Sequence, residues 1–304
     1  MTDEEFNFLL EDRKQKIQQI NDEHNFQEKA YIAFSGGKDS MILSHLVDMA
    51  LPKNRIPRVY VNTGIEYLIQ VNFVKSLKEN DDRIYIIKPT KNVQETLEEV
   101  GYPFKSKYHG HMMNTLNNSG MTESLKKYFF PVKNTPHSCP KILQYQATEK
   151  LPFKISDKCC KEFKKKPFRF YEKQTGRAIA ITGIRGAVGG IHEIAGCLTY
   201  EHGKVRMFNP LQPISEKFCQ IFVERFDINL SPLYYAPYNF KRTGCKGCPL
   251  NVHLKDDLQV LASYLPNEYK NCWNIWEPVY KEYQRIGYRI KAESFSVQNE
   301  FELE

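Results

Sequence analysis

The stretch YIAFSGGKDSMILSHL (Tyr31–Leu46) joins an apolar strand to a helix through the hexapeptide Ser-Gly-Gly-Lys-Asp-Ser. A helix that begins near Lys38 leaves backbone N–H groups and the positive end of its dipole at the turn, and both attract anions. Gly36 and Gly37 carry no Cβ, so a ligand can approach the main chain there. The junction therefore predicts a phosphate-binding loop, and the alternative is a plain Gly-Gly turn.

The polar residues of the hexapeptide have separate expected roles. Ser35 and Ser40 supply hydroxyl donors, and Lys38 supplies a positive charge. Asp39 would repel a phosphate, so we expect it to cap the helix or to hold a divalent cation such as Mg²⁺. The glycine spacing does not follow the Walker pattern G-x-x-x-x-G-K-[ST], so a different class of phosphate loop is indicated.

Strands and helices alternate on both sides of this junction. Apolar runs predict strands at 30–35, 58–64, 83–89 and 177–186, and intervening runs predict helices at 38–50, 68–80 and 92–101. A leading helix is expected over residues 5–28. This alternation favours an α/β fold with a doubly wound, mostly parallel sheet covered on both faces.

The sequence suggests three segments. A leading helix (1–28) precedes a nucleotide-binding domain (29–215), and a helical C-terminal region with a Cys-x-x-Cys loop (216–304) follows it. Within the second segment, residues 102–150 are expected to form loops and short helices that cover a site. The Trp- and Tyr-rich helical tail predicts core packing, with a base-stacking platform or a partner interface as alternatives.

Composition limits the class of protein. The chain has 304 residues and a net charge of +7, with a sequence pI of about 8.8. No apolar run approaches the roughly 20 residues of a membrane span, and the first residues lack a secretory signal, so we expect a cytoplasmic protein without a membrane partner. The basic run at 161–170 would attract an anionic partner such as nucleic acid, unless it is only a solvated face.

Several motifs together resemble a known superfamily. They are SGGKDS, VNTGIEY (61–67), GIRG (183–186), FNPLQPIS (208–215) and GCKGCP (244–249). SGGKDS resembles the PP-loop of the ATP pyrophosphatase superfamily, whose fold is of the adenine nucleotide alpha hydrolase-like type. Within it, the chain resembles the phosphoadenylyl-sulfate (PAPS) and adenylyl-sulfate reductase-like family from Ala30 to about Leu250. The resemblance implies ATP, adenylyl sulfate or PAPS as the ligand.

Two further motifs end predicted strands, where open α/β sheets bind their ligands. Asn62, Thr63 and Gly64 follow the second strand, and Gly183 and Arg185 follow a later one. We expect all five to line the nucleotide site. Arg185 would bind phosphate or sulfate with both arms of its guanidinium group, and its alternative role is a surface ion pair.

The chain departs from the resembled family at two places. After Arg185, where many relatives have a Glu-Ser pair and another Arg, it has GAVGGIHE (186–193). The family's reductases carry a nucleophilic cysteine in a C-terminal Glu-Cys-Gly-Leu-His tail, whereas no cysteine follows Cys272 here. The standard reductive step therefore has no obvious nucleophile, although Cys139 could act as a sulfur-carrying or resolving thiol.

Four cysteines form two short groups. Cys159 and Cys160 are adjacent, and Cys245 and Cys248 form Cys-x-x-Cys. Four thiolates suffice for a tetrahedral zinc ion or a [4Fe–4S] cluster, and unconnected structural thiols are the remaining alternative. The combination resembles the ligands of adenylyl-sulfate reductases and of DNA phosphorothioation sulfurtransferases, which implies a [4Fe–4S] cluster. Nearby lysines would offset its negative charge, namely Lys161, Lys164, Lys165, Lys166 and Lys246.

These observations favour an ATP pyrophosphatase that activates an oxygen of a nucleic acid or nucleotide for sulfur transfer. Mg²⁺, Lys38 and Arg185 would stabilise charge on the pyrophosphate. Asp39 is the third expected catalytic residue, as a candidate ligand of the cation. The expected protein partners are a cysteine desulfurase or an electron donor. One alternative is a sulfonucleotide reductase that uses Cys139 or a partner's thiol. A second is a nucleotide-sensing binding module.

Overall fold

The computed structural model describes residues 1–133, 135, 137–186 and 196–290, which divide into two compact units. Within these described residues, unit 1 comprises 1–62, 68–88 and 166–243, and unit 2 comprises 63–67, 89–165 and 244–290. The leading helix and residues 216–243 thus both belong to unit 1. The three segments expected from the sequence stay a prediction of domain organisation, since the units follow spatial contacts and not chain order.

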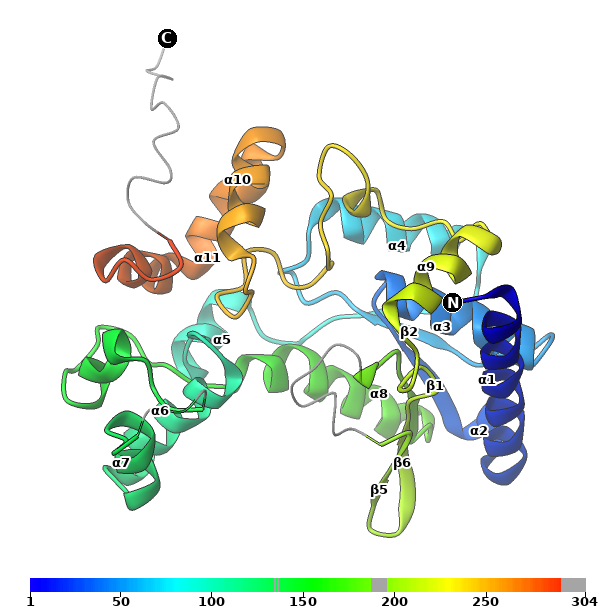
Figure 1. Ribbon diagram of the computed structural model, residues 1–304, viewed down its shortest axis with the longest axis horizontal. Coiled ribbons are helices and arrows are strands. Elements are labelled where there is room, and N and C mark those ends of the chain that lie inside the picture. Colours follow the sequence, from blue (N-terminus) through cyan, green and yellow to red (C-terminus); the bar gives the residue numbers. More distant parts are fainter. Residues whose placement is uncertain (134, 136, 187–195, 291–304) are drawn as a thin grey trace. The chain divides into compact units, whose positions relative to one another are not determined.

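Unit 1 is built on a six-stranded sheet in the order β3-β2-β1-β4-β6-β5 (Figure 1). The strands are β1 (Ala30–Phe34), β2 (Arg58–Val61), β3 (Ile84–Ile87), β4 (Ile179–Ile181), β5 (Leu198–Glu201) and β6 (Lys204–Phe208). All neighbours pair in parallel except β5, which is antiparallel to β6. The predicted α/β class with a mostly parallel sheet is confirmed.

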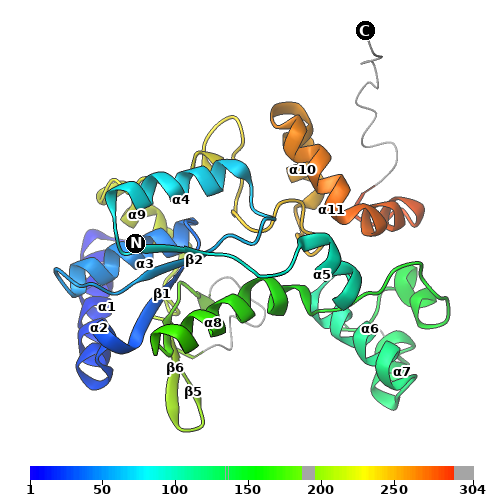
Figure 2. The ribbon, with the colours of Figure 1, turned by 180° about the vertical axis from the view of Figure 1, so that it is seen from behind.

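Helices pack on both faces of this sheet. They are α1 (Asp3–His24), α2 (Phe26–Lys29), α3 (Lys38–Ala50), α4 (Leu68–Asn80), α8 (Lys166–Thr175), α9 (Glu216–Arg225) and the 3₁₀ helix η5 (Pro232–Tyr234). The larger core joins β1 to α1, α3, α4 and α9, and includes Phe6, Ile42, Phe73 and Phe218. On the other face, Phe168 and Tyr171 of α8 pack against Tyr31. Figure 2 shows the helix α8 on this side of the sheet. The sheet is therefore doubly wound.

The expected leading helix is divided in two. α1 begins at Asp3, where Thr2 and Glu5 form a capping box with bonds of 3.1 and 2.8 Å. It ends at His24. The next residue, Asn25, has a left-handed φ of 50° and lies between α1 and α2. Asn tolerates this conformation better than most residues, so the chain turns there before it enters β1.

The β5–β6 hairpin was not predicted from the sequence, in which the last expected strand is 177–186. Glu201 pairs with Lys204 across a two-residue turn, in which His202 and Gly203 have φ values of 50° and 75°. Positive φ values at both central residues are typical of type I′ turns, whose twist matches that of the flanking strands. The short run Leu-Thr-Tyr-Glu before His-Gly was the signal that could have revealed it.

Unit 2 is mainly helical. Its elements are α5 (Val93–Val100), α6 (Lys107–Ser119), α7 (Glu123–Phe129), the 3₁₀ helix η1 (Lys141–Ala147), the π-helical turn η2 (Lys161–Lys165), α10 (Leu254–Tyr264) and α11 (Pro266–Arg285). The region 102–150 is more regular than expected, because α6 extends over 13 residues. Across the described parts of both units, no helix combines the length and apolar character that a membrane span requires.

Candidate functional site

The two serines of SGGKDS brace the turn between β1 and α3. The Ser35 backbone N–H donates to Ser40 Oγ at 3.2 Å, and the two hydroxyl oxygens lie 3.1 Å apart. Gly37 N–H donates to Ser35 Oγ at 3.3 Å, while Ser40 Oγ donates to the Gly37 carbonyl at 2.8 Å. The loop is therefore held in shape by its own hydroxyl groups, at the N-terminus of a 13-residue helix.

Close packing explains both glycines. Gly36 has a φ of 68°, and an added Cβ would lie 2.5 Å from the side chains of Gln70 and Val74 on α4. Gln70 also donates to the Ser35 carbonyl at 3.0 Å. At Gly37, a Cβ would come within 2.8 Å of the Thr243 hydroxyl. Neither position can accept a larger residue without displacing its neighbours.

Tyr234 contacts the loop from η5 and was not anticipated from the sequence. Its hydroxyl oxygen accepts a hydrogen bond from the Lys38 backbone N–H at 3.0 Å and lies 3.3 Å from the Thr243 hydroxyl. The contact joins residues 196 positions apart, so no local pattern could indicate it. The hydroxyl thus occupies a donor that a phosphate oxygen would use.

Four charged side chains meet beside the loop. Arg185 donates through Nε to Asp39 Oδ1 at 2.9 Å and through Nη2 to Glu216 Oε2 at 2.8 Å. The other oxygen of Glu216 accepts from Lys38 Nζ. Burial alone would raise the pKa of Glu216, but its bonds to Lys38 and Arg185 outweigh that effect and lower it. Arg185 is only 5% exposed, whereas its two carboxylate partners are partly exposed, so its ion pairs are partly buried.

The structure places the other predicted nucleotide residues in different units. Gly183 contacts the start of α3, since an added Cβ would lie 3.0 Å from the Asp39 carbonyl oxygen. Asn62 directly follows β2 in unit 1, where its N–H donates to the Ile87 carbonyl at 2.8 Å. Thr63 and Gly64 belong to unit 2. Their predicted role in nucleotide binding stays a prediction.

In unit 2, the turn at 63–67 supports the Cys-x-x-Cys loop. Glu66 accepts hydrogen bonds from the backbone N–H and hydroxyl group of Thr63 at 2.8 Å each, which fixes the turn. The Ile65 carbonyl then accepts from the Lys246 N–H at 2.8 Å. Lys246 lies between the two cysteines of the loop, so this turn helps to position them.

The four predicted ligand cysteines all lie in unit 2. Cys159 Sγ donates to Cys160 Sγ across 4.0 Å. This bond, assisted by Lys107, Lys164 and Lys165 and opposed by burial, lowers the pKa of Cys160 to about 6 and raises that of Cys159. The pair therefore loses one proton readily and the second with difficulty.

Lys164 of η2 is the cation placed among these thiols. The Cys245 thiolate raises the pKa of Lys164 above its ordinary value, and Glu66, Cys160 and Cys248 act in the same direction. Burial raises the pKa of Cys245, and it raises that of Cys248 to about 12. The four thiols thus interact electrostatically with one another, and three of them, Cys160, Cys245 and Cys248, also interact with Lys164.

Lys246 forms a buried ion pair. Its ammonium group donates to Glu268 of α11 at 2.6 Å, and both side chains are about 10% exposed or less. The expected role of Lys246 in offsetting the charge of a cluster stays a prediction. Within the described residues, no group of three or more His, Cys, Asp or Glu side chains is placed to hold a single metal ion.

An aromatic face on α11 holds the Cys-x-x-Cys loop by its carbonyl groups. Trp276 Nε1 donates to the Lys246 carbonyl at 2.9 Å, and Tyr283 donates to the Pro249 carbonyl at 3.0 Å. Tyr280, between them, donates to the Gly247 carbonyl. The three side chains recur every three or four residues and are at most 1% exposed, so they are core residues and present no surface for stacking bases.

Gly247 is required by this arrangement. Its φ is 58°, and an added Cβ would collide with the Tyr280 hydroxyl and lie 2.8 Å from Cys272 Sγ. Both the backbone conformation and the space therefore exclude other residues at the centre of the loop.

We predict that Gly247→Ala displaces the loop and lowers the free energy of unfolding by about 2–4 kcal/mol, through backbone strain and overpacking. Gly203→Ala is the matched control, because Gly203 has a φ of 75° but no atom within 4 Å of an added Cβ, so strain alone of about 1 kcal/mol is expected. Urea unfolding measures both changes. Faster reaction of Cys245 and Cys248 with a thiol reagent should accompany only the first, and equal effects of the two variants would contradict the analysis.

Cys139 is buried, which disfavours the role of mobile thiol suggested for it. It is 1% exposed, and burial raises the pKa of its thiol to about 11. Its neighbour Tyr128 also bonds His109 Nδ1 at 2.8 Å, and Gln146 bonds the other ring nitrogen at 2.8 Å. His109 is fully buried, and burial lowers its pKa from 6.5 to about 4. These groups form a satisfied polar core.

His109 should make stability depend on pH. In the unfolded chain His109 binds a proton near pH 6.5, and in the folded chain only near pH 4. The contribution of neutral His109 to the free energy of unfolding is therefore fully present above pH 6.5. It falls by about 3 kcal/mol as the pH drops from 6.5 to 4. In His109→Gln, urea midpoints between pH 7.5 and 4.5 should fall less steeply than in the wild type. Asn118→Gln, an exposed change on the same helix that removes no titratable group, should leave the slope unaltered.

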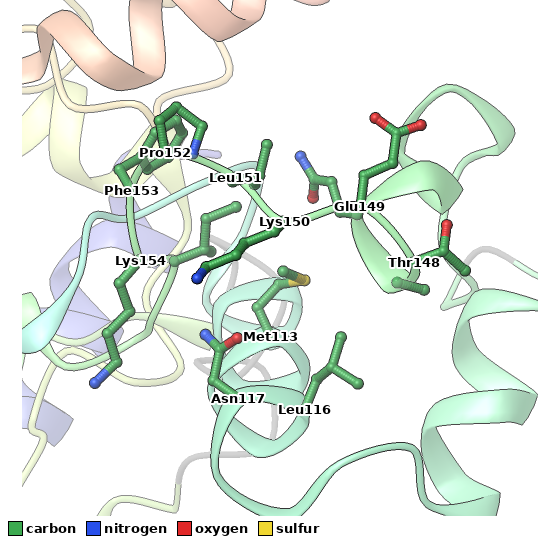
Figure 3. A pocket seen from close by; sticks show the side chains of 13 residues that line it. Met113, Leu116, Asn117, Thr148, Glu149, Lys150, Leu151, Pro152, Phe153 and Lys154 are labelled. Atoms are coloured by element: carbon green, nitrogen blue, oxygen red, sulfur yellow. The ribbon is translucent and has the colours of Figure 1, made fainter.

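A cavity of about 470 Å³ lies in unit 2 away from the cysteines. Figure 3 shows Met113, Leu116 and Asn117 of α6 on one side and residues 148–154 on the other. None of the residues predicted to bind nucleotide or metal lines it. The cavity is therefore separate from both sets of candidate residues.

Comparison with known proteins agrees with the loop and sheet geometry. Residues 29–251 match the family described as the phosphoadenosine phosphosulfate reductase domain. The chain belongs to this family. A curated relative, an uncharacterized protein from Methanocaldococcus jannaschii, is 30% identical over 96 residues, which are 32% of this chain and 22% of that protein. The match thus spans about a fifth of the relative. The resemblance to PAPS reductases drawn from the motifs is confirmed.

Solved structures of low sequence identity are also similar. PAPS reductase from Candida auris is 12% identical with a TM-score of 0.45, and the match covers 81% of this chain and 96% of that one. The U34-tRNA thiolase NcsA from Methanococcus maripaludis, solved with its [4Fe–4S] cluster, is 14% identical with a TM-score of 0.42 over 98% and 86%. An NH3-dependent NAD synthetase from Campylobacter jejuni is 12% identical with a TM-score of 0.40 over 92% and 95%.

Proposed function

We propose that this member of the PAPS reductase family is an ATP pyrophosphatase that activates an oxygen of a nucleic acid or nucleotide for replacement by sulfur, with a [4Fe–4S] cluster as its resident cofactor. The observation that carries the proposal is that four cysteines from two distant segments lie in unit 2 and interact electrostatically with one another, three of them also with Lys164. The PP-loop of unit 1 supports the ATP part. Family membership supports adenine nucleotide chemistry at that loop.

The loop residues suit the first step. The acceptor oxygen would attack the α-phosphorus of ATP, forming an O–P bond as the bond to pyrophosphate breaks. Backbone N–H groups at the start of α3 would bind the phosphate chain, and Lys38 and Arg185 would stabilise the charge that develops on pyrophosphate. Asp39, in the first turn of α3, is the candidate ligand of Mg²⁺. Sulfur would then displace AMP from the activated position.

The cysteines suit a cluster better than a single ion. A [4Fe–4S] cluster binds each thiolate to a different iron, so its ligands stand farther apart than four ligands of one zinc ion. The four thiols interact electrostatically, but within the described residues no three of them are placed to hold one metal ion. This spacing is compatible with a [4Fe–4S] cluster. The low pKa of Cys160 supplies a thiolate at neutral pH, and Lys164 offsets negative charge. When bound, the cluster would supply a site for sulfide.

The cluster is tested by iron analysis. Protein purified without oxygen should contain about four irons and four acid-labile sulfides per chain. Cys159→Ala and Cys248→Ala should each lose most of this iron and the visible absorption. Cys219→Ala, which removes a buried thiol from the core of unit 1, should retain both. Zinc in place of iron, or equal loss in all three variants, would contradict the proposed ligand set.

The nucleotide part is tested by binding and product analysis. Lys38→Ala should weaken ATP binding by roughly 10- to 100-fold, because it removes a charge-assisted contact with phosphate. Lys241→Ala, an exposed change in the same unit, should not alter it. Pyrophosphate and AMP are the products expected from ATP with an oligonucleotide acceptor and a sulfide source. Release of sulfite from PAPS or adenylyl sulfate, with no pyrophosphate from ATP, would instead identify a sulfonucleotide reductase.

A further inference from the structure

The charged groups beside the PP-loop of unit 1 balance one another. Lys38 and Arg185 provide two positive charges, and Asp39 and Glu216 provide two negative ones. The loop that should bind a polyphosphate therefore has no net charge in its immediate side chains. An anion gains little from such a site unless one of the carboxylates moves away.

Glu216 is the carboxylate placed to move. One of its oxygens binds Lys38 and the other binds Arg185, so a single side chain occupies both cations. Its side chain is 50% exposed, and it lies in the first turn of α9, from which it can turn into water. Asp39 is less exposed, at 36%, and contacts only Arg185 among these cations.

A phosphate chain that reaches both cations must take the place of Glu216, because each has a carboxylate oxygen within bonding distance. We propose that Glu216 is a specificity-determining residue: a tethered anion that competes with the ligand and thereby selects nucleotides whose phosphate chain engages Lys38 and Arg185 together. The inference rests on the proposed binding of ATP at this loop and adds a residue that no motif indicated. Ligands that contact only the backbone of the loop gain nothing from its displacement.

The competition has two measurable consequences. Glu216→Gln keeps the size of the side chain and removes its charge, so the site changes from neutral to singly positive. Anions that bind both cations should then bind more tightly. Their dissociation constants should also depend more steeply on salt, because the attraction now includes a net charge that ions can screen. A residue that only supported the fold would not change the salt dependence.

The test measures binding to the full chain in EDTA, so that Glu216 cannot act through a divalent cation. The probes are ATP, inorganic pyrophosphate and adenosine, each titrated at low and high salt. Glu216→Gln should bind ATP and pyrophosphate roughly tenfold more tightly at low salt, with a steeper loss at high salt, and should leave any adenosine binding unchanged. Glu224→Gln, an exposed change on the same helix, should behave as the wild type in every titration.

The outcomes separate this inference from the proposed function. ATP binding that is unchanged or weakened by Glu216→Gln, in a protein that unfolds at the wild-type temperature, overturns the role of Glu216 alone. A tighter affinity without a steeper salt dependence also overturns it, because the gain would not come from removed charge. If neither protein binds ATP at any salt concentration, the nucleotide site itself is wrong and the inference fails with it.

Discussion

Parallel pairing of β1 with β2 on one side and with β4 on the other determines where chemistry can occur in unit 1. The register aligns Ile32 with both Arg58 and Ile181, so the three strands end at one edge of the sheet. SGGKDS and the segment that carries Gly183 and Arg185 leave from that edge. Residues 146 positions apart, Asp39 and Arg185, can therefore share a hydrogen bond.

In unit 2 the equivalent constraint is the need to satisfy buried carbonyl groups. The carbonyls of Cys245 and Cys248 accept hydrogen bonds from N–H groups within the loop region. For the carbonyls of Lys246, Gly247 and Pro249, α11 supplies donors from long aromatic side chains. Those donors lie at the ends of rigid rings, which fixes the distance between helix and loop. The glycine between the cysteines then follows from the contact with Tyr280. The aromatic side chains of α11 are thus explained by the loop that they support.

The sequence predicted what depends on local pattern. Neighbouring residues predict three features: the strand-loop-helix junction at 31–46, the alternation of strands and helices that builds a parallel sheet, and the grouping of the cysteines. The structure confirms the first two. Charge partners were not predictable in the same way. Lys246 lies beside thiols in the sequence but pairs with Glu268, and Lys38 pairs with Glu216, 178 positions away. Tertiary packing decides which carboxylate reaches a lysine, and a single sequence contains no record of it.

The side chains beside the PP-loop and the segment 89–165 differ in their balance of charge, which bears on how each would meet its ligand. Beside the PP-loop, cations and carboxylates cancel, so binding there depends on short-range contacts with a phosphate chain. Residues 89–165 of unit 2, by contrast, carry 13 lysines and seven acidic residues, a net charge of +6 within a chain of +7. A surplus of this size acts over about 10 Å at ordinary salt and raises the local concentration of anions. Under the proposed function, an anionic acceptor such as nucleic acid would therefore be attracted to the segment that contains Cys159 and Cys160, whereas the nucleotide would be selected by contact at the loop.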